Sequence, residues 1–157
     1  MTDPLLVAAR DVVQDALGEL RRALEGADTA TLNAVPAGPD SNSLAVLGAH
    51  ALSSTRSWLA LATQAPLPPR DRPAEFRTSV QDPAGFLTWV DAEAEACRRL
   101  LMDADSFDPA HVGFAPWRGG AEAEEPVTAG WALLHAVAHL REHVGHVQLT
   151  RQVLDGS

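Results

Sequence analysis

A run of histidines near the end of the chain has the spacing of a metal site. Four of the six histidines occur at positions 135, 139, 143 and 146. On a helix, residues four apart differ by only about 40° around the axis, so these side chains share a stripe about 80° wide. Two imidazoles one turn apart can bind a single ion at metal–nitrogen distances of about 2.0–2.1 Å. The pattern therefore indicates a divalent-metal site on a helix.

The apolar face of the same helix distinguishes between the four histidines. Its centre lies roughly 100° from His139, as judged from Leu133, Ala136, Leu140, Val144 and Val147. His143 lies nearest to this face and His139 next, so these two are the predicted ligand pair. His146 and His135 lie farther out and remain alternatives for either position.

A third ligand must come from elsewhere in the chain, and His50 is the candidate. It shares one side of an earlier helical stretch with apolar residues such as Leu47 and Trp58. A histidine on such a face either forms hydrogen bonds with other buried polar groups or completes a metal site. Three protein ligands leave coordination positions open, which is typical of a catalytic ion, whereas a closed structural site has four.

Four stretches with helical periodicity must position these residues. They are predicted from Asp3-Pro4 to Gly26, from Ser41 or Asn42 to about Thr63, from Asp82-Pro83 to about Met102, and from about Val127 to Leu154. One short turn is expected over 29–33. The prolines between 66 and 73 argue against regular helix there, and no alternating strand pattern is evident.

These elements predict the fold class. Helices of about 20 residues are close to 30 Å long and pack naturally as a bundle. The second and third connections, each roughly twenty residues long, could cross an end of such a bundle. We therefore expect an all-α four-helix bundle with long crossover connections, as a single domain over residues 1–157.

Composition narrows the partners and the compartment. The net charge of −9 argues against nucleic acid, and no basic amphipathic stretch suits an anionic membrane. The sequence contains no apolar run of about 18 residues, which is the length needed to span a bilayer. Cys97 is the only cysteine, so an intramolecular disulfide is impossible. The N-terminus lacks the pattern of a secretory signal, and we predict a cytoplasmic protein.

The connection before the last helix contains Trp117 and Arg118, followed by two glycines. These side chains could cover one end of a pocket and contact a cofactor, and Arg118 has the donor geometry to pair with a carboxylate. A tryptophan in such a loop that only caps the core is the alternative. Trp117 and Arg118 are therefore the candidate cofactor-binding residues.

Two segments resemble the DinB-like proteins. Residues 32–50, which run from Leu-Asn-Ala-Val-Pro to Gly-Ala-His, resemble the family's Pro/Gly segment, Asn-Ser helix start and first metal histidine. His139-Leu-Arg-Glu-His143-Val-Gly-His146 resembles its last-helix pattern, His-x3-His-x-Gly-Gln. Position by position, the resemblance implies His50, His139 and His143 as the ligands. His146 stands where the family pattern has glutamine.

The resemblance also implies a fold and a class of chemistry. It implies a four-helix bundle with a crossed-over helix order and a Zn²⁺- or Ni²⁺-type ion, in a family whose members are frequently homodimers. Family members of known activity are S-transferases and isomerases that use bacillithiol, mycothiol or glutathione.

Two hypotheses for the function follow. The first is a metal-dependent thiol S-transferase, with a hydrolase that activates water as a variant. The second is a non-catalytic stress protein that binds a metal or a small molecule, and a purely structural bundle without a metal is a further alternative. The expected partner is a small-molecule substrate or thiol in the first case. The sequence does not separate the two hypotheses, because both need the same ligands.

Overall fold

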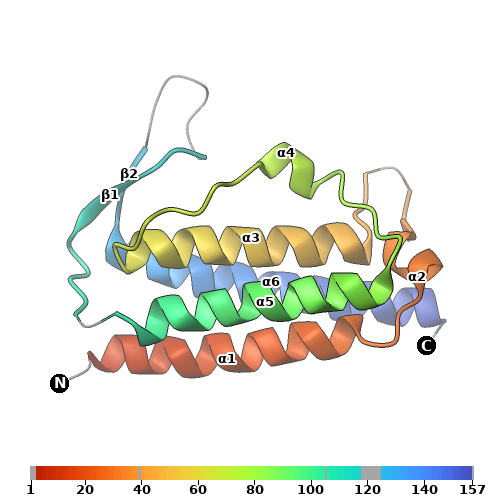
Figure 1. The fold of residues 1–157 in the computed structure, drawn as a ribbon, viewed down its shortest axis with the longest axis horizontal. Helices are drawn as coiled ribbons and strands as arrows, with labels where there is room; N and C mark the ends of the chain where they lie inside the picture. Colours follow the sequence, from red (N-terminus) through yellow and green to blue (C-terminus); the bar gives the residue numbers. More distant parts are fainter. Residues whose placement is uncertain (1–2, 39, 105, 118–124, 157) are drawn as a thin grey trace.

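Four long helices form the body of the protein. The computed structural model describes residues 3–38, 40–104, 106–117 and 125–156. The long helices are α1 (Pro4–Leu24), α3 (Leu44–Ala62), α5 (Pro83–Met102) and α6 (Ala129–Asp155), and Figure 1 shows them side by side. Two short helices, α2 (Thr29–Asn33) and α4 (Arg72–Glu75), lie in the connections. The all-α fold expected from the sequence is confirmed.

Helix starts coincide with side-chain caps. Asp3 and Asp82 each accept a backbone N–H in the first turn of α1 and α5, and each is followed by proline. Ser43 caps α3 and Thr128 caps α6 in the same way. These caps satisfy N–H groups that the helix itself leaves unpaired. The predicted starts of α1 and α5 are confirmed, and α3 and α6 begin about two residues later than predicted.

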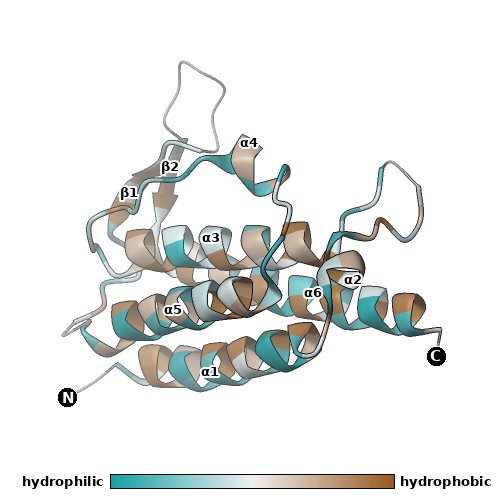
Figure 2. Cartoon of the chain, turned by 45° about the vertical axis from the view of Figure 1, so that its right-hand side comes forward, coloured by the Kyte–Doolittle hydropathy of each residue, from teal (hydrophilic) through white to brown (hydrophobic). Residues whose placement is uncertain are grey.

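The bundle has a crossed-over order. Helix α3 packs mainly against α6 and α5, and α1 packs against the same two helices. Helices α1 and α3, consecutive long helices in the chain, are therefore diagonal neighbours. In Figure 2, hydrophobic and hydrophilic residues alternate along the ribbons of α1 and α5. Cys97 is buried in the core of the bundle.

Helix α3 is the most deeply buried element, because further segments cover its outer side. Residues 63–82, here called the strap, run over α3 and carry α4 (Figure 1). The expectation that prolines exclude regular helix between 66 and 73 is wrong for Arg72 and Pro73, which belong to α4. Pro73 lies in the first turn of α4, where a proline leaves no helical hydrogen bond unmade, and Asp71 caps that turn.

A β-hairpin precedes α6, which the sequence did not predict. Strand β1 (Val112–Ala115) pairs antiparallel with β2 (Glu125–Thr128). The hairpin lies close against α3: a Cβ on Gly113 would stand 3.3 Å from the Leu61 side chain. Each strand has four residues, too few for a recognisable alternating pattern. Among the described residues, no helix has the length and apolar character needed to cross a membrane.

Candidate metal centre

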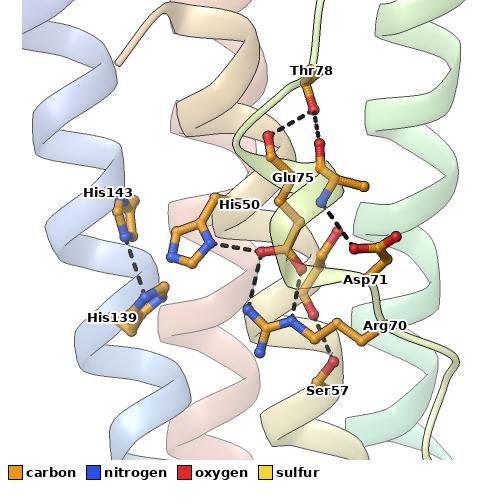
Figure 3. A network of polar contacts seen from close by, with 10 residues as sticks. His50, Ser57, Arg70, Asp71, Glu75, Thr78, His139 and His143 are labelled. Atoms are coloured by element: carbon orange, nitrogen blue, oxygen red, sulfur yellow. Dashed lines mark hydrogen bonds and ion pairs between the residues drawn. The ribbon is translucent and has the colours of Figure 1, made fainter. Parts of the chain in front are cut away.

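Three imidazoles from two helices converge between α3 and α6. One ring nitrogen from each of His50, His139 and His143 lies within 4.8 Å of the other two. The Nε2 atoms of His139 and His143 are 3.2 Å apart, and the His50 ring centroid lies 5.1 and 4.9 Å from theirs. Figure 3 shows the three rings facing one another. The structure thus brings together the three histidines that the helical pattern and the resemblance selected.

Helix packing explains this convergence. The four-residue spacing of His139 and His143 places both rings on the side of α6 that faces α3. His50 lies on the facing side of α3, near the start of that helix. Because His50 contacts His139 while Trp58, eight residues later, contacts His135, the two helices run in opposite directions.

The two alternative histidines lie outside this group. In the described part of the chain, only His50, His139 and His143 form a set of three metal-ligating side chains. The His135 ring instead stacks on Trp131, with centroids 4.7 Å apart. His146 is exposed and faces a separate cavity of about 320 Å³.

The environment of the α6 pair keeps its imidazoles neutral. Burial lowers the pKa of His139 to about 3 and that of His143 to about 4, and neighbouring histidines act in the same direction. A neutral imidazole is the form that binds a metal. The Nδ1 atoms of both rings are buried without a hydrogen-bond partner. Three neutral nitrogens at this spacing fit a divalent ion such as Zn²⁺ or Ni²⁺.

Glu75 orients His50. The Nδ1 of His50 lies 2.7 Å from Oε2 of Glu75, whose side chain is only 6% exposed. Burial alone would raise the pKa of Glu75, but hydrogen bonds from His50 and Arg70 outweigh it, and the pKa lies below its usual value. An ionised carboxylate can only accept, so His50 carries its proton on Nδ1. Its Nε2 lone pair is then available to a metal.

Arg70 completes the support of Glu75 (Figure 3). Its Nε and Nη2 donate to the two oxygens of Glu75 at 2.7 and 3.1 Å, and its side chain is 6% exposed. A buried carboxylate needs such a partner, because an unpaired buried charge is strongly unfavourable. Thr78 Oγ1 also donates to the backbone carbonyl of Glu75 and holds the end of α4.

Neither Glu75 nor Arg70 was identified from the sequence. Both lie in the strap, which was interpreted only as a proline-containing connection. One signal was present: Asp71, one residue before Arg72-Pro73, resembles the cap-and-proline starts of the first and third predicted helices. That signal would have found α4, although not the direction in which Glu75 points.

The predicted cofactor-binding residues have different outcomes. Trp117 is half-buried, stands edge-on to Trp58 with centroids 5.1 Å apart, and lies 5.7 Å from the guanidinium carbon of Arg70. It is therefore joined to the Glu75 network through Arg70. Arg118 lies outside the described residues. Phe76, at the end of α4, places its ring 4.7 Å from that of His50.

Comparison with known proteins agrees with this fold. Residues 8–156 match a family model described as mycothiol-S-transferase. A crystal structure of a conserved protein from Enterococcus faecalis superposes with a TM-score of 0.75 at 15% sequence identity, over 100% of this chain and 99% of that chain. This likeness shows a common fold. No curated protein matches the sequence.

Proposed function

We propose that this chain, which belongs to the mycothiol-S-transferase family, a DinB-like family, is a metal-dependent S-transferase using a low-molecular-weight thiol. Mycothiol is the first candidate for that thiol. The observation that carries the proposal is the convergence of His50, His139 and His143, whose ligand atoms lie within 4.8 Å of one another.

The three histidines would hold one divalent ion, with Zn²⁺ or Ni²⁺ expected because imidazole suits both. A site with three protein ligands retains an open position, as catalytic sites do. A divalent ion there supplies the positive charge that keeps a bound thiol in its thiolate form at neutral pH.

The chain has no suitable thiol of its own, which supports an external one. Cys97 is the only cysteine. It is buried in the core, and burial raises its pKa to about 12. Because the thiolate is the reactive form, Cys97 is inert at neutral pH. Sulfur transfer by this protein therefore requires a thiol cofactor that enters from solvent.

The surrounding residues position the reaction. Glu75 fixes the ring of His50, and Phe76 lies against that ring and shields it from water. Trp117 is proposed to contact the cofactor, since it lies beside Arg70 at the edge of the same network. Arg118 remains a predicted contact for a carboxylate. A cytoplasmic homodimer remains a prediction from the sequence.

The test combines metal binding with thiol binding. Protein purified without a histidine tag should contain about one divalent ion per chain, as three convergent imidazoles imply. Titration of a cobalt-substituted sample with mycothiol, bacillithiol and glutathione should then change the visible spectrum for at least one thiol. Thiol-dependent consumption of a chloronitroarene should be lost in His50→Ala. A cobalt spectrum that none of the thiols perturbs would contradict the transferase proposal and favour a non-catalytic metal-binding protein.

A further inference from the structure

A row of rings leads along α6 away from the candidate ligands. His143, His139, His135 and Trp131 follow one another at intervals of four residues. Their ring centroids are 4.4, 5.5 and 4.7 Å apart in that order, and the last pair is stacked with an interplanar angle of 10°. The first two rings belong to the candidate metal centre, whereas His135 and Trp131 have no role in the proposed chemistry.

Other aromatic residues hold this row in place. Trp58 of α3 stands edge-on to His135 and Trp131, with centroids 4.8 and 5.3 Å away, and Trp117 stands edge-on to Trp58. Three of the four tryptophans of the chain are therefore gathered here. Trp58 is only 3% exposed, so it forms a rigid backing for the two outer rings.

The row rises from the helix interface to the surface. His139 and His143 are half-buried, whereas Trp131 is 41% exposed. Residues four apart shift by about 40° around the helix, so each step turns the row further toward solvent. The eight residues from His139 to Trp131 correspond to about 12 Å along the axis. A ligand on the outer rings could thus extend inward to the metal centre.

We infer that Trp131 and His135, here called the ring strip, bind the sugar and cyclitol rings of a glycosylated thiol. This inference rests on the proposed thiol chemistry and assigns a second part of the same cofactor. Mycothiol carries its cysteinyl group on a glucosamine joined to inositol, and this arrangement spans a length comparable to the row. The C–H faces of such rings pack against indole, whose face carries partial negative charge.

The ring strip would also determine which thiol is used. Glutathione has no ring to place on Trp131, and it would bind through its sulfur and peptide groups alone. Ligand sites combine apolar and aromatic walls with a few polar groups, and the His135 imidazole supplies such a polar edge next to the indole.

The opposite direction along α6 offers a different surface. The cavity of about 320 Å³ beyond His143 is lined by Leu47, His146, Leu149 and Val153 among others. Among its lining residues, His146 is the only one with an aromatic ring, so the cavity offers no indole face. Leu149 is 61% exposed and lies eighteen residues, or five full turns, after Trp131, so both point the same way from the helix. Leu149 is therefore a matched control for Trp131.

The experiment measures ligand affinity of the metal-loaded protein by calorimetry. The ligands are mycothiol, N-acetylcysteine (a thiol without the rings) and glucosaminyl-inositol (the rings without the thiol). Trp131→Ala should weaken mycothiol binding about tenfold, a size expected for loss of one aromatic contact, and abolish binding of glucosaminyl-inositol. N-acetylcysteine should bind Trp131→Ala as it binds the wild type. Leu149→Ala should leave all three affinities unchanged.

Two results would contradict binding at the ring strip. In the first, glucosaminyl-inositol binds the wild type and Trp131→Ala equally well, or binds neither. In the second, Leu149→Ala loses mycothiol affinity and Trp131→Ala does not. Failure of the proposed function has another signature. In that case neither thiol would perturb a cobalt-substituted site, while glucosaminyl-inositol would still bind the wild type better than Trp131→Ala.

Discussion

The two helices that supply the candidate ligands prepare them in different ways. On α3, the Nδ1 of His50 donates to a buried carboxylate, Glu75, which Arg70 holds in turn. On α6, the Nδ1 atoms of His139 and His143 are buried with no partner among the described residues. Hydrogen bonds therefore fix the ring and the tautomer of His50. The ring orientations of His139 and His143 must instead be fixed by packing and by the contact between the two rings.

This difference has an energetic consequence. The 3.2 Å contact between the Nε2 atoms of His139 and His143 requires a proton on one of them. The Nε2 atom that carries this proton must lose it before both Nε2 atoms can bind a metal. In a neutral imidazole the proton then lies on Nδ1, so both Nδ1 atoms must be protonated. A buried donor without an acceptor costs about 1–3 kcal/mol. The α3 side is preorganised for a metal, whereas the α6 side must be stabilised by the metal itself.

The largest effect should come from removing an α6 ligand. We expect His143→Ala to abolish stoichiometric metal, because two remaining imidazoles hold a divalent ion poorly. Metal content measured by mass spectrometry on purified protein tests this. His146→Ala is the matched control, since His146 is exposed and lies one turn further along α6. Unchanged metal content in His143→Ala would show the assignment to be wrong, and His135 or His146 would become the ligand to test.

A smaller effect is expected on the α3 side. Glu75→Gln should weaken metal affinity about 10- to 100-fold, as loss of a carboxylate that orients a ligand histidine generally does. Competition with a chromophoric chelator measures the affinity. Glu93→Gln is the control, because Glu93 pairs with Arg56 at 2.9 Å but contacts no ligand.

The Glu75→Gln variant also leaves Arg70 buried without its partner, so a second variant is needed. Glu75→Gln combined with Arg70→Met removes that unpaired charge and should show the same loss of metal affinity. If both variants bind metal like the wild type, packing alone positions His50, and the two sides of the centre are equivalent.

The same contrast explains what the sequence could predict. His139 and His143 are encoded by spacing within one helix, and the caps at Asp3 and Asp82 are encoded by neighbouring residues. His50 could be found because its helix has an apolar face. Such patterns are local, and a periodicity of 3.6 residues makes them visible.

The parts that could not be predicted depend on the path of a connection. Glu75 reaches His50 only because the strap crosses α3, and no local pattern fixes that crossing. Glu142, which adjoins His143 in sequence, is exposed, so closeness in sequence would have suggested the wrong carboxylate. The hairpin depends on pairing between β1 and β2, and each strand is too short to be recognised alone.

Acid should affect the α6 side specifically. The folded-state pKa values of about 3 for His139 and about 4 for His143 lie below the usual 6.5. Between the folded-state pKa values and 6.5, these two imidazoles bind more protons in the unfolded chain than in the folded one. The free energy of unfolding therefore falls as the pH falls from 6.5 toward 4. The loss is at most about 1.4 kcal/mol per pH unit for each imidazole, and partial exposure reduces it.

Urea denaturation of metal-free protein at pH 7, 6 and 5 measures this loss. A variant with His139→Gln and His143→Gln should lose less stability over the same range. The window above pH 5 avoids the titration of Glu75, whose pKa lies below its usual value. An identical loss in the variant and the wild type would show that the α6 pair is not the cause.

Removing the metal should have the smallest effect on the helical structure itself. The hydrophobic core consists mainly of residues from the four long helices, and none of its packing contacts requires the ion. Metal loss removes only the linkage free energy, about 2.7 kcal/mol when the free metal is 100 times its dissociation constant. A chelator at neutral pH should therefore leave the helical circular dichroism unchanged and lower the melting temperature by several degrees. Loss of most of the helical signal on chelation would show instead that the ion holds α3 and α6 together.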